Sequence, residues 1–243
     1  GDQISIPVEQ IHLLSKYVSS DGKAPKLNKL NDGHFKKAKQ KVKNQVEDIA
    51  DDLIKLYSER SQLKGFAFSA DDEDQHAFDD AFPYVETDDQ LRSIEEIKRD
   101  MQDSQPMDRL LVGDVGFGKT EVAMRAAFKA VNDHKQVVVL VPTTVLAQQH
   151  YTNFKERFQN FAVNIDVLSR FRSKKEQTET LEKLKKGQVD ILIGTHRVLS
   201  KDVVFADLGL MIIDEEQRFG VKHKETLKEL KTQVDVLTLT ATP

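Results

Sequence analysis

Gly113-Asp-Val-Gly-Phe-Gly-Lys119-Thr120 is a glycine-rich stretch with the spacing G-x-x-x-x-G-K-T. A short apolar run, Leu110–Val112, precedes it directly, and a run with helical character, Glu121–Val131, follows it. Glycines let the backbone turn so that successive N–H groups point at phosphate oxygens, and the N-terminus of the following helix adds partial positive charge. The pattern therefore predicts a phosphate-binding loop between a strand and a helix, rather than an ordinary surface turn.

Two side chains of this loop suit a nucleotide with Mg²⁺. The ammonium group of Lys119 can reach the β- and γ-phosphates, and the hydroxyl of Thr120 can bind Mg²⁺. We assign a catalytic role to Lys119 as well. The residues assigned to nucleotide binding in the loop are Gly113, Asp114, Val115, Gly116, Phe117, Gly118, Lys119 and Thr120.

The composition is that of an ordinary globular protein, with 39% apolar and 31% charged residues in 243. No apolar run approaches the roughly 18 residues that span a bilayer, and residues 1–20 lack the pattern of a secretory signal. Zero cysteines exclude disulfides and thiolate metal sites. The net charge of −4 neither indicates nor excludes nucleic-acid binding, because a basic channel can be local. We expect a cytoplasmic protein with no membrane partner.

From Phe82 onward, strand-like and helix-like runs alternate. Most of the strand-like runs are continuously apolar, as in parallel strands covered on both faces. The candidate strands are Leu110–Val112, Val137–Val141, Val163–Leu168, Val189–Ile193, Leu210–Ile213 and Val236–Thr240, and the candidate helices are Glu121–Asn132, Val145–Phe158, Lys174–Lys186 and Lys222–Lys231. This order predicts an α/β domain with a mainly parallel sheet, whose ligands lie at the carboxyl ends of the strands.

The part before Phe82 has a different character. Apolar residues at steps of three and four predict one long amphipathic helix over His34–Leu63, on the order of 45 Å long. The helix packs its apolar stripe on the adjacent domain, serves as a mechanical link, or docks a partner. Eight lysines and one acid lie between Lys23 and Lys43, and nine acids without Lys or Arg lie between Asp71 and Asp89. Such runs are usually solvated surfaces, and we interpret the acidic run as a flexible connector.

A second candidate site element follows the apolar run Leu210–Ile213, which leads into Asp214-Glu215-Glu216-Gln217. A buried strand that ends in acids delivers carboxylates to the ligand edge of the sheet. Asp214 can hold Mg²⁺ from the side opposite Thr120, and Glu215 can polarise a water for attack on the γ-phosphate. Acids after a strand also begin solvated loops, but their combination with the phosphate loop favours a hydrolytic site.

Upstream, Thr87-Asp-Asp-Gln90 precedes an amphipathic run. The amide of Gln90 carries a donor and an acceptor, which suits the two-sided edge of adenine. Taken alone this signal is weak, because Thr87 is also a good helix N-cap. At this point an ordered set of motifs is complete: Thr87/Gln90, the phosphate loop, Pro142-Thr-Thr144, Gly194-Thr-His196, Asp214–Gln217 and Thr240-Ala-Thr242.

In this order the motifs resemble those of superfamily-two helicases and translocases, over Phe82–Pro243. Within that superfamily the chain is most similar to bacterial transcription-repair coupling factors, whose motor is RecG-like. The strings that carry this resemblance are Gly113–Val122, Leu146–His150, Ser169–Arg172 and Asp214–Gly220, together with Ile6–Ile11, Pro25–Leu30 and Val46–Ala50 upstream.

The resemblance implies a RecA-like P-loop domain that binds ATP and Mg²⁺ and drives movement on double-stranded DNA without reading its sequence. In coupling factors that movement displaces stalled RNA polymerase and recruits excision-repair proteins. The implied parts are 1–24, the end of a polymerase-interacting domain; 25–81, a helical connector with the acidic linker; and 82–243, the first motor domain. The residues implied to face DNA are Thr143, Thr144, Arg170, Arg172, Thr195 and His196, and those implied to couple hydrolysis to DNA grip are Thr240 and Thr242.

Simpler interpretations exist for each of these residues. Arg170 and Arg172 could be surface arginines, Thr143 and Thr144 could cap the next helix, and His196 could be a packed residue. Two other functions also remain open: the motor of a RecG-type fork-remodelling helicase, and a non-catalytic module that docks a partner.

The chain begins with Gly1 and stops at Pro243, directly after a strand-like run, so we expect a piece of a longer protein. In motors of this kind a second domain supplies arginines that stabilise the transferring phosphate, which is worth roughly 10³–10⁵ in rate. We therefore expect this chain alone to bind ATP weakly and to hydrolyse it very slowly.

Overall fold

The computed structural model divides the chain into two compact units, Gly1–Ser58 and Glu59–Pro243. The residues whose structure is described are 6–9, 37, 39–44, 58, 63–216, 219, 227 and 234–241. In the first unit these include a helical piece at 39–44, in which Gln40 Nε2 donates to Asn44 Oδ1 at 2.8 Å. The rest of the predicted helix His34–Leu63 falls almost wholly outside the described residues, so its length stays a prediction.

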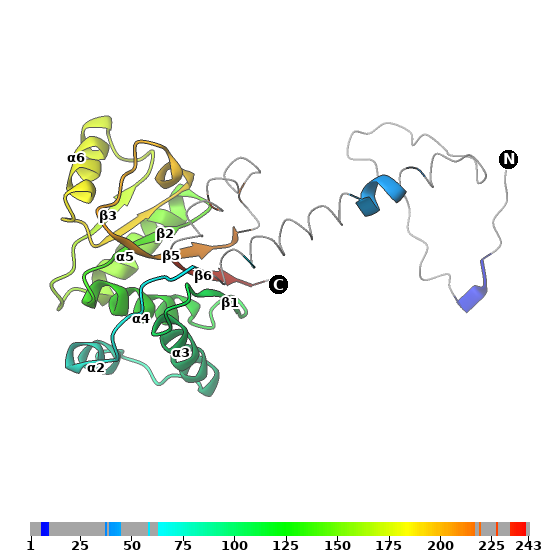
Figure 1. Ribbon diagram of the computed structural model, residues 1–243, viewed down its shortest axis with the longest axis horizontal. Helices are drawn as coiled ribbons and strands as arrows, with labels where there is room; N and C mark the ends of the chain where they lie inside the picture. The colour runs from blue at the N-terminus through cyan, green and yellow to red at the C-terminus, as the bar shows by residue number, and fades with distance from the viewer. Residues whose placement is uncertain are drawn as a thin grey trace. The chain divides into compact units, whose positions relative to one another are not determined.

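The second unit is built on a six-stranded sheet in the order β1-β6-β5-β2-β4-β3 (Figure 1). Every neighbouring pair is parallel, which confirms the α/β fold with a mainly parallel sheet. The strands are β1 Asp108–Val112, β2 Gln136–Leu140, β3 Ile165–Leu168, β4 Ile191–Gly194, β5 Leu208–Asp214 and β6 Asp235–Thr240. Each predicted strand is present, with its ends shifted by three residues or fewer.

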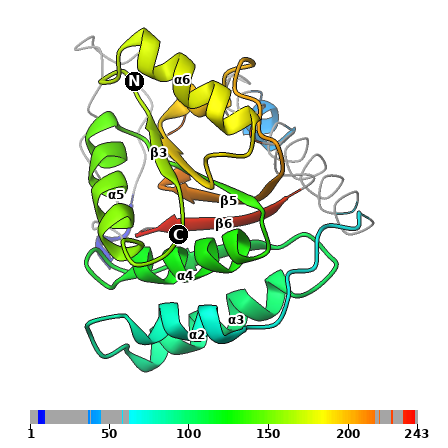
Figure 2. The same ribbon diagram turned by 90° about the vertical axis from the view of Figure 1, so that its left-hand side faces the viewer.

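Helices cover both faces of the sheet, as Figure 2 shows. They are α2 Glu73–Asp80, α3 Asp88–Met101, α4 Lys119–Asn132, α5 Thr144–Arg157 and α6 Lys174–Lys185, with a short 3₁₀ turn, η2, at His196–Leu199. α4 and α5 lie on one face and α6 on the other, while α2 and α3 lie outside α4 (Figure 2). The predicted helix Lys222–Lys231 lies outside the described residues except for Leu227, which is helical and buried.

Two hydrophobic cores result from the alternation of side chains along the central strands. Val137 and Val139 of β2 point into the core under α3, α4 and α5, whereas Val138 and Leu140 point into the core under α6. All five residues of β2 are buried. A continuous apolar run is therefore required here, because neither face of the strand meets water.

The acidic run around α2 is a folded part of this unit, so the prediction of a flexible connector there is wrong. Asp72 caps α2 by accepting a hydrogen bond from the backbone N–H of Gln75 at 2.9 Å. Phe78 is fully buried, and its ring stacks on that of Phe128 in α4 with 4.3 Å between ring centroids. One buried aromatic side chain contributes roughly 1.5–3 kcal/mol, which is enough to anchor so short a helix.

Buried cations from α3 and α4 neutralise these acids. Lys98 bonds Asp71 at 2.7 Å and Asp79 at 2.5 Å, and Lys129 bonds Asp71 at 2.7 Å. Burial disfavours the charged form of Asp71, but the hydrogen bonds from Lys129 and Lys98 outweigh it, so its pKa lies below the ordinary value. Lys98 and Lys129 stand 27 and 58 residues from Asp71 in the sequence, so the acidic run taken alone gives no sign of these ion pairs.

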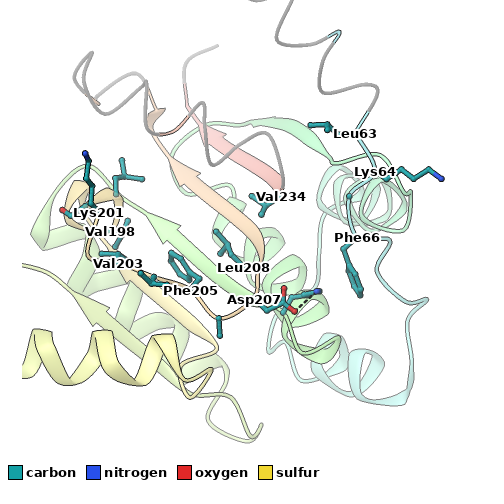
Figure 3. A pocket seen from close by; sticks show the side chains of 16 residues that line it. Leu63, Lys64, Phe66, Val198, Lys201, Val203, Phe205, Asp207, Leu208 and Val234 are labelled. Carbon is teal, nitrogen blue, oxygen red and sulfur yellow. Dashed lines mark hydrogen bonds and ion pairs between the residues drawn. The ribbon is translucent and has the colours of Figure 1, made fainter.

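A hollow of about 1040 Å³ lies at the amino ends of β2, β5 and β6. Figure 3 shows Leu63 and Phe66 on one side of it, and Val203 and Phe205 on the other. Ligands of parallel α/β sheets bind at the carboxyl ends of the strands, which is the opposite edge. The hollow is therefore separate from the candidate site.

Candidate active site

The phosphate loop connects the end of β1 to the start of α4, as predicted. Gly116 and Gly118 have φ angles of 88° and 72°, in the left-handed region that favours glycine. The backbone N–H of Gly113 donates to the carbonyl of Thr240 at 3.1 Å, which ties the loop to the end of β6. The loop is thus held at the carboxyl edge of the sheet, in front of the N-terminus of α4.

Lys119 lies across this loop. Its Nζ donates to the carbonyl of Asp114 at 2.9 Å and also to the carbonyl of Gly113. These contacts hold the ammonium group over the curl of the backbone. A phosphate seated on the loop would meet that positive charge together with the N–H groups at the start of α4.

Gln90 serves both as a cap and as a neighbour of the loop. Thr87 is the N-cap of α3, and the two residues form a reciprocal capping box, with Thr87 N to Gln90 Oε1 at 2.9 Å and Gln90 N to Thr87 Oγ1 at 3.2 Å. The amide Nε2 of Gln90 donates to the carbonyl of Phe117 at 3.0 Å. Thr87 therefore caps α3, and the same turn places Gln90 beside the phosphate loop.

The acids after β5 lie at the same edge of the sheet, because β6 is the neighbour of both β1 and β5. Glu215 has a φ of 55°, which is uncommon for a residue with a side chain. Its N–H donates to the carbonyl of Leu239 at 2.9 Å, and its Oε1 accepts from the N–H of Ala241 at 3.1 Å. Oε2 of Glu216 lies 3.5 Å from the hydroxyl of Thr238. Gln217 and Thr242 are outside the described residues.

Asp214 has a buried histidine as its neighbour. Nε2 of His150, on α5, lies 3.2 Å from Oδ2 of Asp214. When Asp214 is ionised it only accepts hydrogen bonds, so Nε2 must carry the proton. Nδ1 of His150 is buried and has no hydrogen-bond partner among the described residues. His150 ends one of the strings that carry the family resemblance, Leu146–His150, but nothing local in the sequence links positions 150 and 214 or gives the histidine a role.

The residues at this edge fit a magnesium ion in chemical type. Mg²⁺ is usually held by one or two protein oxygens together with phosphate oxygens and waters. The carboxylate of Asp214 and the hydroxyl of Thr120 supply such oxygens. His150 takes only Oδ2 of Asp214, and Oδ1 accepts no hydrogen bond within the described part of the chain.

A second hollow, of about 490 Å³, lies beyond the carboxyl ends of β2, β3 and β4. It brings together five of the six residues predicted to face DNA. The residues that line it are Pro142, Thr143, Thr144, Arg170, Gln177, Thr195, His196 and Arg197. Arg197 and Gln177 were not predicted. Arg197 directly follows the motif Gly194-Thr-His196, whereas Gln177 lies within α6 and had no local signal.

Arg172 is the predicted DNA-facing residue that does not line this hollow. Its guanidinium lies 3.2 Å from Asp166 and 3.5 Å from Glu176. Arg170, in contrast, is exposed and has no ion pair among the described residues. Thr143 does cap α5, accepting from the N–H of Leu146 at 3.2 Å, as the simpler interpretation of that residue proposed.

Comparison with known proteins agrees with this architecture. The sequence profile of DEAD/DEAH box helicases matches residues 87–243, which span the cap of α3, the phosphate loop and the acids after β5. The chain belongs to the DEAD/DEAH box helicase family. That family comprises ATPases of the helicase and translocase class, as the ordered motifs predicted.

Among curated proteins, the chain is 66% identical over 243 residues to the transcription-repair-coupling factor of Bacillus subtilis (strain 168). It is 60% identical over 242 residues to that of Staphylococcus haemolyticus. Both alignments cover 100% of this chain but 21% of the relative, so the chain spans about a fifth of their length.

Among solved structures, RecG bound to a three-way DNA junction is similar, with a TM-score of 0.69 and 36% identity. That similarity covers 78% of this chain and 25% of RecG. No helix in the described part of this DEAD/DEAH box chain is both long and apolar enough to cross a membrane.

Proposed function

We propose that this chain is the ATP-binding half of a motor which, in a longer protein, moves along double-stranded DNA. The observation that carries the proposal is the carboxyl edge of the sheet. The phosphate loop and Asp214–Glu216 occupy one half of this edge, and the hollow with Arg170 and His196 occupies the other. Both ligand surfaces therefore rest on strands of one rigid sheet.

In the nucleotide half, the loop N–H groups and Lys119 bind the phosphates of ATP, and Thr120 and Asp214 hold Mg²⁺. Bound Mg²⁺ neutralises charge on the β- and γ-phosphates. Glu215 orients the water that attacks the γ-phosphate, with its carboxylate held by the N–H of Ala241. Gln90 reads the adenine from its place beside Phe117.

In the DNA half, hydroxyl and guanidinium groups contact phosphates, which positions a protein without reading sequence. Five residues that follow the ends of β2, β3 and β4 make these contacts: Thr143, Thr144, Arg170, Thr195 and His196. Arg172 lies outside the hollow and supports these contacts indirectly, through its ion pairs with Asp166 and Glu176. Thr240 and Thr242 couple the two halves, because the carbonyl of Thr240 already bonds the first residue of the phosphate loop.

In the longer protein we assign the motor to the displacement of stalled RNA polymerase and the recruitment of excision-repair proteins in the cytoplasm. The similarity to transcription-repair-coupling factors over the whole chain supports this assignment. The three proposed parts are 1–24, 25–81 and 82–243. Residues 63–81 of the second part belong to the same compact unit as the sheet, with Phe68 and Phe78 in its core.

The test uses the full-length protein and its Lys119→Ala and Glu215→Gln variants. We expect Lys119→Ala to lose ATP binding, and Glu215→Gln to bind ATP but to lose DNA-stimulated hydrolysis. Both variants should fail to release a stalled polymerase. Retention of polymerase release by Lys119→Ala would contradict the motor and favour a partner-docking module.

The similarity to RecG keeps fork remodelling as a second candidate. The two functions differ in substrate. A protein that regresses model forks but leaves stalled polymerase in place would be a fork-remodelling helicase. We expect the opposite result.

A further inference from the structure

Arg125, on the second turn of α4, is a buried cation that the proposed chemistry does not use. It is 3% exposed, and its Nε donates to Glu121 Oε1 at 2.9 Å while its Nη2 donates to Glu86. Burial disfavours the charged guanidinium, but the hydrogen bonds to Glu121 and Glu86 outweigh it and raise the pKa of Arg125. The side chain is therefore a fixed positive charge that needs its acidic partners.

Both carboxylate oxygens of Glu121 accept hydrogen bonds from arginines. Besides Arg125, it bonds Arg157 through both oxygens, with distances of 2.8 and 3.0 Å. Arg157 also donates to the carbonyl of Phe78 at 2.7 Å, so a rotation of its side chain away from Glu121 would break this hydrogen bond as well. Although Glu121 directly follows Thr120, its carboxylate is thus committed to holding Arg125 and Arg157 rather than a ligand.

Glu86 is the more exposed end of this arrangement. It lies in the loop between α2 and α3, and its side chain is 22% exposed. The hydrogen bond from Arg125 is the main cause that lowers the pKa of Glu86. Glu86 immediately precedes Thr87, whose N–H is bonded by the amide of Gln90. Fixing Glu86 therefore fixes the turn from which Gln90 reaches Phe117 in the phosphate loop.

We propose that Arg125 is a positioning residue that sets base preference: through Glu86 it holds the Thr87–Gln90 turn against the phosphate loop. The inference rests on the proposed function, in which Gln90 reads adenine. Loss of the ion pair lets the turn move relative to the loop. The phosphate contacts, which come from α4 and the loop backbone, do not depend on Glu86.

The test separates base recognition from phosphate recognition. The affinities of the protein for ATP, GTP and inorganic tripolyphosphate are measured with Mg²⁺ by titration calorimetry. We expect Glu86→Gln to bind ATP about five- to tenfold more weakly, the loss of one charge-assisted hydrogen bond, with tripolyphosphate affinity unchanged. The ATP:GTP affinity ratio should fall accordingly.

The matched control is Glu96→Gln. Glu96 also accepts a hydrogen bond from an arginine, Arg109 at 2.7 Å, but it lies on the third turn of α3, whereas Gln90 lies on the first. It should keep the parental ATP:GTP ratio. Arg125→Gln should act as Glu86→Gln does, and Glu86→Gln, being partly exposed, supplies the answer if the buried substitution prevents folding.

Two results would overturn the inference. One is a folded Glu86→Gln variant with the parental ATP:GTP ratio, and the other is an equal loss of ATP and tripolyphosphate affinity. Gln90→Ala shows which assumption failed. If Gln90→Ala lowers the ratio and Glu86→Gln does not, only the role of Arg125 is wrong. If Gln90→Ala leaves the ratio unchanged, the base-reading role of Gln90 is wrong as well.

Discussion

At the scale of single residues, Gly118 shows why the phosphate loop needs glycine at one particular place. Its φ is 72°, and a Cβ built there would lie 2.1 Å from Nε2 of Gln90. The left-handed backbone therefore disfavours other residues here, and a side chain at this position would also push the amide of Gln90 away from the loop. The spacing of the motif predicted a glycine-dependent turn. It did not predict the approach of Gln90, because that residue belongs to a different helix, α3.

We predict that Gly118→Ala weakens ATP binding by more than about tenfold, because the new methyl group displaces Gln90 as well as straining the loop. The left-handed strain alone is worth about 1–2 kcal/mol. Gly187→Ala is the control: its φ is 70°, but the nearest atom to its Cβ is 3.7 Å away. It should lower the free energy of unfolding and leave ATP affinity unchanged. Equal ATP affinity in both variants would show that the contact between Gln90 and the phosphate loop does not contribute to ATP binding.

His150 supports a second prediction at this scale. Removing its hydrogen bond to Asp214 frees the carboxylate to rotate, so His150→Phe should raise the Mg²⁺ concentration needed for half-maximal ATP binding on the order of tenfold. A Mg²⁺ titration at fixed ATP measures this. His150→Gln retains an N–H donor and should recover part of the loss. If His150→Phe needs no more Mg²⁺ than the parent, the histidine only fills space.

At the scale of elements, α2 shows that the charges of a segment do not by themselves predict whether the segment is folded. Asp71–Asp89 carries nine acids, and a solvated connector was the reasonable prediction. The helix forms because Asp72 caps it and Phe78 stacks on Phe128. The acids of this run pair with Lys98, Lys129 and Arg125, which belong to α3 and α4, so the pairing depends on how these helices pack.

The lowered pKa of Asp71 predicts a pH dependence. Its ordinary value is 3.8 and its value in the folded protein is lower, so at neutral pH it is ionised in both the folded and the unfolded chain. As the pH falls below 3.8 the unfolded chain binds the proton first, and the stabilisation is lost. The free energy of unfolding of the parent should therefore exceed that of Asp71→Asn by a constant amount at neutral pH, and the excess should shrink below pH 3.8. Urea denaturation over a pH series measures it; a constant excess down to pH 3 would contradict the ion pairs.

At the scale of the whole motor unit, the carboxyl edge of the sheet decides which predicted residues act together. Arg170 and Arg172 are two residues apart in the sequence, yet only Arg170 lines the hollow with Thr143 and His196. Arg172 turns to Asp166 and Glu176 instead. A resemblance between sequences cannot separate them, because the difference arises from which acids the neighbouring elements provide.

We therefore predict that Arg170→Ala in the full-length protein weakens double-stranded DNA binding and lowers the slope of log affinity against log salt by about one. Arg172→Ala should change that slope less, since its charge is already paired. Affinity measured across a salt series distinguishes the two variants. A larger slope change for Arg172→Ala would reverse the assignment.

The sequence by itself determined the strands β1–β6 and the helices α4–α6 in their order along the chain, the phosphate loop and the resemblance to the family, because periodicity and short motifs express local preferences of the backbone. It also indicated the edge of the sheet at which the ligands lie, since parallel strands carry their ligands at their carboxyl ends. Only the tertiary structure decided which side chains meet there. His150 reaches Asp214 across 64 positions, Arg125 reaches Glu86 across 39, and the acidic run predicted as a flexible connector contains the packed helix α2. The physical reason is that such contacts depend on how separate elements pack, and packing partners leave no periodic signal in the chain.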